Sequence, residues 1–344
     1  MITPANVSFG CDPEAFFTKG GKVVGSEKVL PEKGILAPPL KYSLAHTGVV
    51  LDGVQFELHT LPSGSPVGVG RELAAAFKLL KQHLLSLPDI EVCFIPTVTV
   101  EREELATLSE RARVLGCAPS LNLYGIPSIA VDGADYPQRS AGGHVQLGLN
   151  APIFSPYDTD CDNREDLVAL MDLLVGNTCV LLDRDPLASA RRKNYGRPGE
   201  YRLPRHGLEY RTLSNFWIAA QPLTCFVFEM SHLAVSILST ALTQKNKIDE
   251  QLMSRVNPKK IVSAIMENDL QLAQENFTTV RDFINEVKPG PGMGLTAETL
   301  PAFDRFVEGV QEKGLQHFFP EDPVEHWCRP DEHKGWGTFL AGVK

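Results

Sequence analysis

Four segments of this sequence place two polar side chains at positions i and i+2, a spacing that puts both on one face of a β-strand. The pairs are Asp12 and Glu14, Glu57 and His59, His144 and Gln146, and Glu209 and Arg211. The residues between them are Pro13, Leu58, Val145 and Tyr210, which mostly suit an opposite, packed face. The pattern predicts an α+β fold with a mainly antiparallel curved sheet. Helices would cover one face of the sheet, and the polar face would form an active-site floor.

Strands and helices are also expected along the rest of the chain. Val49–Leu58 has the β-branched and aromatic content of a strand with a turn near Asp52-Gly53. Further strands are expected at Glu91–Val100 and Gly143–Leu149. Hydrophobic periodicity predicts helices at Pro66 to about Leu87, Glu101–Leu115, Asn163–Leu182, Phe216–Leu242 and, with gaps, Ile248–Phe306. We expect residues 1–245 to form a catalytic domain and residues 246–344 to form a helical C-terminal extension packed on it.

The segment Arg191–Arg211 is the most basic part of the chain. It holds seven Lys and Arg against two Glu, whereas the whole chain has a formal net charge of -9. Clustered guanidinium groups suit an anionic ligand such as phosphate. A structural interpretation stays open, because a turn at Pro204–Gly207 would place Arg202 opposite Glu209 and Glu200 opposite Arg211 as ordinary cross-strand ion pairs. The two interpretations are compatible.

Composition excludes several classes of protein. With 43% hydrophobic and 22% charged residues, the chain is expected to form a packed core. Its acidic balance argues against a general binder of nucleic acid or of anionic membranes. The seven cysteines contain no C-x-x-C pair, and no signal peptide or membrane-spanning stretch is evident. We therefore expect a cytoplasmic protein.

The order of motifs along the chain resembles that of the phage-type carboxylate–amine ligases, which are related to glutamine synthetase and glutamate–cysteine ligase. The motifs are Gly10-Cys-Asp-Pro-Glu14, Asp52-Gly-Val-Gln-Phe-Glu57, Gly116-Cys-Ala-Pro119, Ala141-Gly-Gly-His-Val-Gln-Leu-Gly148 and the run from Tyr195 to Trp217. The resemblance covers roughly residues 8–240. It implies a glutamine-synthetase-like catalytic fold and ATP-dependent amide formation through an acyl phosphate. The substrates would be small-molecule or peptide carboxylates and amines, and a phage-encoded enzyme would act in the host cytoplasm.

The resemblance also implies roles for individual residues. The positions that match ligands of Mg²⁺ or Mn²⁺ and of the nucleotide phosphates are Glu14, Glu57, His144 and Glu209, with Asp12 as a further candidate. The positions that match arginines acting on the transferred phosphoryl group are Arg202 and Arg211, with Arg139 and Arg192 as further candidates. Tyr195, Gln146, Arg192 and Arg202 are expected to contact the bound ATP.

One position departs from the family pattern, because many relatives have a second histidine where this chain has Gln146. An amide can orient a phosphate or a substrate, but it cannot carry a proton as imidazole does. Two alternatives to a ligase therefore stay open. One is a non-catalytic module that binds a nucleotide or peptide, and the other is a metal-dependent hydrolase that uses the same carboxylates.

Overall fold

The computed structural model describes residues 7–38, 46–114, 120–127, 136–149, 163–183, 185–287, 300–314 and 322–328, and its fold is α+β, as predicted. Among these residues all strand pairs are antiparallel. The first sheet has the order β1 (Val7–Cys11), β11 (Val145–Leu149), β13 (Gly207–Tyr210), β12 (Glu200–Arg202) and β9 (Leu121–Asn122). The second has the order β3 (Lys22–Val24), β2 (Glu14–Lys19), β6 (Gln55–His59), β5 (Gly48–Asp52) and β4 (Ile35–Leu36), with β7 (Glu91–Cys93) beside β2.

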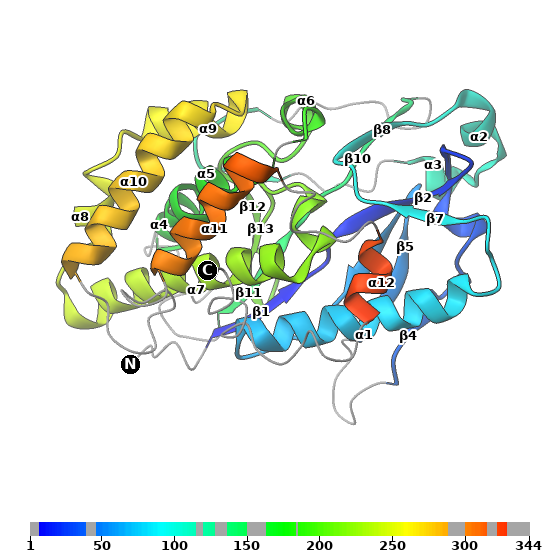
Figure 1. Cartoon of the computed structure of the whole chain (residues 1–344), viewed down its shortest axis with the longest axis horizontal. Coiled ribbons are helices and arrows are strands. Elements are labelled where there is room, and N and C mark those ends of the chain that lie inside the picture. The colour runs from blue at the N-terminus through cyan, green and yellow to red at the C-terminus, as the bar shows by residue number, and fades with distance from the viewer. Residues whose placement is uncertain are drawn as a thin grey trace.

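The two sheets form one bent surface instead of a single regular sheet (Figure 1). β1 runs into β2 through Asp12 and Pro13, so this segment belongs to both sheets. The chain after β6 continues the pairing past the bend, because Leu58 N–H donates to the Pro13 carbonyl at 2.9 Å and Ser63 N–H donates to the Phe9 carbonyl at 2.8 Å. The first sheet therefore meets the second at Asp12, the first residue of the predicted polar floor.

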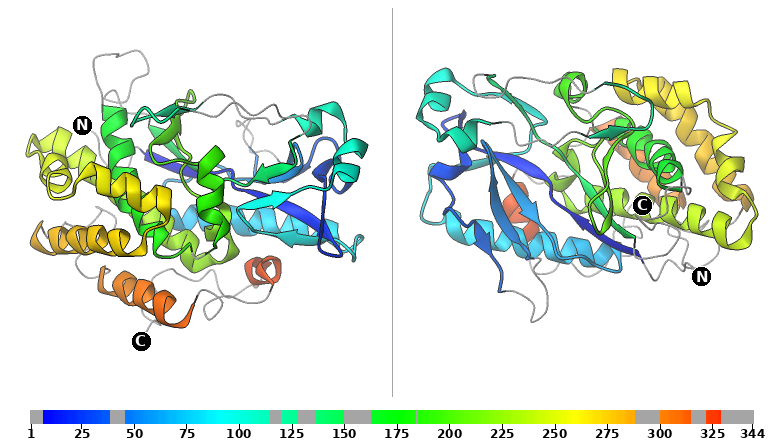
Figure 2. Two further views of the ribbon diagram at one scale, coloured as in Figure 1. Left: turned by 90° about the horizontal axis from the view of Figure 1, so that it is seen from above. Right: turned by 180° about the vertical axis from the view of Figure 1, so that it is seen from behind.

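Helices cover one side of this surface (Figure 2), and their buried side chains share a hydrophobic core with those of the strands. α1 (Pro66–Leu84) begins at Ser65, whose side chain accepts the Gly68 N–H, and it packs against β5 and β6. α4 (Asn163–Met171), the π-helical turn η4 (Asp172–Gly176), α5 (Asn177–Val180) and α7 (Gln221–Gln244) lie behind the first sheet. Tyr210, between Glu209 and Arg211, faces these helices and donates to Asp172 Oδ1 at 2.6 Å.

α7 is long and apolar enough to cross a membrane by length and composition. Most of it is buried in this fold against α1, α4 and η4, so it is a core helix. The remaining helices of the C-terminal part are α8 (Ile248–Met253), α9 (Pro258–Glu267), α10 (Leu270–Val287), α11 (Leu300–Lys313) and α12 (Pro323–Cys328). Their buried residues belong to the same hydrophobic core as those of β1 and α1.

Three expected elements differ from the structure. The strand expected at Glu91–Val100 is divided into β7 and β8 (Thr97–Thr99), and β8 pairs with β10 (Gln138–Ser140) in a separate small sheet. The helix expected at Glu101–Leu115 is divided into α2 (Arg102–Thr107) and α3 (Glu110–Arg113). The division occurs because Leu108 enters a small second core and the Ser109 side chain caps α3. The helix expected from Phe216 begins at Gln221, after the 3-10 turn η5 (Asn215–Ala219).

The turn at Pro204–Gly207 forms as expected, and Arg202 lies opposite Glu209 across β12 and β13. The second expected ion pair is different. Glu200 accepts the Gly196 N–H at 2.8 Å and pairs with Arg197 at 3.3 Å, while Arg211 turns to Glu209 on its own strand. The expected motif Gly116–Pro119 lies outside the described residues.

Candidate active site

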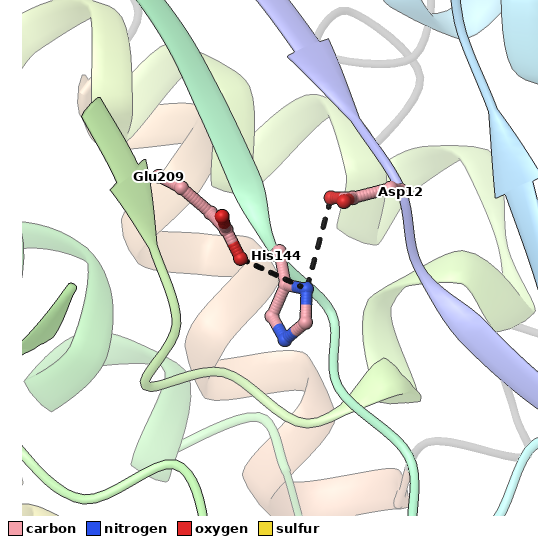
Figure 3. Close-up of side chains that lie close together, drawn as sticks. All are labelled: Asp12, His144 and Glu209. Carbon is pink, nitrogen blue, oxygen red and sulfur yellow. Dashed lines mark ion pairs between the residues drawn. The ribbon is translucent and has the colours of Figure 1, made fainter. Parts of the chain in front are cut away.

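Three of the predicted polar residues meet where the first sheet reaches the bend (Figure 3). Asp12 follows β1, His144 precedes β11, and Glu209 lies in β13, and these strands are adjacent. The Nδ1 atom of His144 lies 3.7 Å from an oxygen of Asp12 and 3.6 Å from an oxygen of Glu209. One ligand atom from each of the three residues can be chosen so that all lie within 4.8 Å of one another.

A second acidic group lies on the adjoining part of the second sheet. It consists of Glu14, Asp52 and Glu57, whose chosen carboxylate oxygens also lie within 4.8 Å of one another. Glu14 and Glu57 are directly opposite in the pairing of β2 with β6. Glu14 also approaches the first group, because one of its oxygens is 4.0 Å from His144 Nε2. The bent surface thus carries two neighbouring acidic groups with His144 between them.

Burial and mutual repulsion change the acidity of these carboxyl groups. Burial, followed by the charge of Glu209, raises the pKa of Asp12 to about 6. Burial is also the first cause that raises the pKa of Glu14 and of Glu57 well above the usual value, and Asp52 adds repulsion to both. Carboxylates forced together in this way favour either a proton or a cation between them.

His144 is suited to be a neutral ligand. Burial, assisted by the charges of Arg211, Arg191 and Arg202, lowers its pKa well below the usual value, so the ring is uncharged near pH 7. Its Nδ1 atom is buried and makes no hydrogen bond with the described part of the protein. A buried imidazole nitrogen without a donor or acceptor, facing two carboxylates, fits a divalent cation bound by one nitrogen and several oxygens. The residues present can therefore offer a divalent cation one nitrogen and several carboxylate oxygens.

The two residues before His144 must be glycines for steric reasons. A Cβ atom on Gly142 would lie 2.2 Å from His144 Nε2, and one on Gly143 would lie 2.2 Å from the Ser214 carbonyl oxygen. Gly142 also places the second acidic group, because its N–H donates to Glu14 Oε2 at 2.7 Å and its carbonyl accepts the Glu14 N–H at 2.8 Å. The Gly-Gly-His motif thus sets the distance between Glu14 and His144.

Arginines surround the other side of His144. Arg211 is buried, and it donates to Glu209 Oε1 and, at 2.8 Å, to the hydroxyl of Tyr195. The same hydroxyl contacts His144 Nε2. The Tyr195 ring lies between two guanidinium groups, with its centroid 4.5 Å from Arg191 Cζ and 5.1 Å from Arg211 Cζ. Arg202 lies 3.7 Å from Glu209 and is partly exposed.

Two predicted arginines have other surroundings. Arg139 in β10 donates to the backbone carbonyls of Tyr136, Gln138 and Arg113. Arg192 donates to the side chain of Asn268 at the end of α9. These contacts hold structural elements together, and neither residue is carried into the proposed reaction below. Gln146, in contrast, lies in the site and donates to Asp12 Oδ1 at 2.9 Å.

Three residues that the fold brings to the site were not predicted from the sequence. Asp52 begins the motif Asp52–Glu57, but the sequence predicts only a turn at this residue. Arg191 precedes the selected Arg192 in α6 (Leu187–Asn194), and its spacing of four residues from Tyr195 is the signal that could have identified it. His206 lies in the β12–β13 turn, and its Nε2 atom is 2.9 Å from Gln146 Oε1. No sequence signal distinguishes that histidine.

Comparison with known proteins bears on the same part of the chain. The model of the family described as phage phiEco32-like COOH.NH2 ligase-type 2 matches residues 131–286, which include His144, Tyr195, Glu209 and Arg211. The match begins later than the motif order suggested and extends further, through α10.

No curated protein matches the chain. Among solved structures, a bifunctional glutathione synthetase from Pasteurella multocida is similar with a TM-score of 0.38 and 12% identity, over 90% of this chain. This chain spans only 56% of the length of that protein. The family match over residues 131–286 alone confirms the predicted resemblance to the phage-type carboxylate–amine ligases.

Proposed function

We propose that this protein is an ATP- and Mg²⁺-dependent carboxylate–amine ligase that forms an amide bond through an acyl phosphate. The observation that carries the proposal is the pair of neighbouring acidic groups, of which the first includes His144. The charges of Arg211, Arg191 and Arg202 act on the same histidine. Phosphoryl transfer from a metal-bound nucleotide needs both kinds of group together, because the anionic phosphates must be positioned and their charge neutralised. The family match over residues 131–286 supports the same class of reaction.

The first step would be attack of a substrate carboxylate on the γ-phosphate of ATP, which gives an acyl phosphate and ADP. Mg²⁺ or Mn²⁺, bound by Asp12, His144 and Glu209 and by the second acidic group, would supply positive charge to the phosphate oxygens. Arg211 is buried and held by Glu209 and Tyr195, so its guanidinium group is oriented before a substrate arrives. Donors fixed in this way stabilise the charge of a transferred phosphoryl group without reorganisation.

The second step would be attack of an amine on the acyl phosphate, with release of phosphate.

We extend the proposal to the architecture, with residues 1–245 as a glutamine-synthetase-like catalytic domain and residues 246–344 as a helical extension. Small-molecule or peptide carboxylates and amines are the proposed substrates.

The first experiment is thermal unfolding with Mg²⁺ alone, ATP alone and both together, on the wild type and on Glu57→Gln. A ligand at one hundred times its dissociation constant adds about 2.7 kcal/mol to the free energy of unfolding. We expect a rise in midpoint that needs both ligands and is lost in Glu57→Gln. Glu103→Gln, which changes an exposed acid on α2, is the matched control and should keep the full rise.

A screen for activity completes this test. Each of the twenty amino acids is supplied as the carboxylate with ATP, Mg²⁺ and hydroxylamine, which converts an acyl phosphate to a hydroxamate. Hydroxamate and ADP formed together would support the ligase. A midpoint that does not change with Mg²⁺ and ATP would contradict the proposed metal–nucleotide site.

A further inference from the structure

A chain of hydrogen bonds leads from the metal-binding carboxylates to a histidine at the rim of the site. Gln146 Nε2 donates to Asp12 Oδ1 at 2.9 Å, and Gln146 Oε1 lies 2.9 Å from Nε2 of His206. The ionised carboxylate of Asp12 can only accept, so the amide nitrogen then faces Asp12 and the amide oxygen faces His206. The nitrogen of His206 at this contact must therefore carry the proton.

The proton on Nε2 determines the state of the other ring nitrogen. A neutral imidazole has one N–H and one bare nitrogen, so Nδ1 of neutral His206 is a proton acceptor. Burial lowers the pKa of His206, and the nearby charge of Glu209 opposes this effect only in part, so the neutral ring is favoured near pH 7. His206 also keeps one side in contact with solvent.

The turn that carries His206 is fixed to the site. The backbone carbonyl of His206 accepts the Leu149 N–H at 2.8 Å, which joins the turn to β11. The turn lies between Arg202 and Glu209, which are opposite each other in β12 and β13. His206 thus lies at the end of β13 near Arg202 and Gln146, and it is exposed to the solvent from which an amine would enter.

Other imidazoles at the site are less suited to receive a proton. His144 has Nε2 at the Tyr195 hydroxyl and Nδ1 directed at the carboxylates. His59 bonds through Nε2 to Glu57 Oε2 at 2.8 Å and lies on the second sheet, away from β12 and β13. Its position makes it a supporting partner of Glu57.

We propose that His206 is the catalytic base that removes a proton from the attacking amine, and this inference rests on the proposed ligase function. The amine nitrogen forms a bond to the acyl carbon, the bond from that carbon to the phosphate oxygen breaks, and phosphate leaves with the electron pair. The excess proton of the amine passes to Nδ1 of His206 and then to solvent. This chain would thereby supply, from a neighbouring turn, the imidazole that Gln146 lacks.

The first test measures the tautomer without any substrate. Long-range ¹H–¹⁵N NMR on the labelled full chain, with His206→Gln to assign the signals, shows which ring nitrogen carries the proton. We expect the Nε2–H form in the wild type. A neutral Nδ1–H form would overturn the inference, because the bare ring nitrogen would then be the one held at Gln146.

The second test separates the two steps of the reaction. His206→Gln keeps a donor toward Gln146 but cannot accept a proton. With an amino acid that gives hydroxamate in the wild type, we expect His206→Gln to form hydroxamate within about threefold of the wild-type rate, because hydroxylamine reacts as a neutral amine. Amide formation with amino acids as the amines should fall by about 10²–10⁴-fold, the range of general-base catalysis.

Each other outcome is decisive. Unchanged amide formation, or an equal fall in both products, would overturn the role of His206 while leaving the ligase intact. His59→Gln is the matched control, and it should lower both products together because it removes the partner of Glu57. If the wild type forms neither hydroxamate nor ADP, the ligase proposal fails, and the inference fails with it.

Discussion

At the residue level, the guanidinium group of Arg211 makes contacts that an ammonium group cannot reproduce. It donates from different nitrogens to Glu209 and to the Tyr195 hydroxyl, and lysine offers a point charge without that planar fork. We expect Arg211→Lys to lower the rate of ADP release in the hydroxylamine assay by about 10²–10³-fold, as for loss of one oriented donor. Arg192→Lys is the control, because Arg192 bonds to Asn268. Similar losses in both variants would contradict the distinction between these two arginines.

A second prediction for a single residue concerns Gly142. A methyl group on Gly142 would collide with the His144 ring. We therefore expect Gly142→Ala to displace the His144 ring and to remove the rise in unfolding midpoint caused by Mg²⁺ and ATP. Gly10→Ala is the matched control, since its Cβ would meet Thr60 at 3.5 Å and Gln146 at 3.8 Å, which are ordinary contacts. Full ligand stabilisation in Gly142→Ala would show that the position of His144 does not matter for binding.

At the level of elements, α7 contains an acidic residue within the core helix. Burial raises the pKa of Glu229 from 4.5 to about 7, so its ionised form is disfavoured in the folded state. Glu229 therefore makes the folded protein less stable as pH rises from about 4.5 to about 7, and Glu229→Gln should lack this one contribution to the pH dependence. One pKa unit corresponds to about 1.4 kcal/mol, so we expect Glu229→Gln to be more stable by about 2–3 kcal/mol above pH 7 and by little at pH 4.5.

Urea unfolding of both proteins across this pH range measures the difference. His232 follows Glu229 in α7 and has its own pKa lowered by burial, and the comparison of Glu229→Gln with the wild type at each pH cancels its contribution. Glu308→Gln, at an exposed position of α11, is the matched control and should change the free energy of unfolding by less than about 0.5 kcal/mol at every pH. A constant difference between Glu229→Gln and the wild type at all pH values would contradict the assigned pKa.

The elements also show what the sequence can and cannot predict. Alternation within a strand predicts which side chains share a face, and Glu57 and Glu209 do lie in strands. Asp12 and His144 lie just outside β1 and β11, so the bend and not alternation sets their positions. The division of Glu91–Val100 into β7 and β8 depends on pairing with two different sheets, which local pattern does not contain. Arg191 and Arg192 are adjacent residues of the same type, so the sequence does not distinguish them. Only the packing of α6 directs Arg191 to Tyr195 and Arg192 to the end of α9.

At the level of the whole molecule, the site depends on parts of the chain that are far apart in sequence. The acidic groups come from both sheets, and the bend at Asp12 brings them together. The apolar side of both sheets rests on one hydrophobic core that extends from Val7 in β1 to Trp327 in α12. Loss of packing at the C-terminal end of this core should therefore lower the stability of the sheets that carry the site.

Trp327 provides the test of this continuity. Its ring is fully buried and stacks on Phe77 of α1 with a centroid distance of 5.3 Å, and its Nε1–H donates to the Ile218 carbonyl at 2.8 Å. Trp327→Ala should lower the free energy of unfolding by about 3–5 kcal/mol, because truncation of a large buried ring leaves a cavity. Leu85→Ala, at a side chain that is 68% exposed, should change it by less than about 0.5 kcal/mol. If α12 were only an accessory of the fold, urea unfolding would give similar values for both variants, and the sheets would not depend on this end of the core.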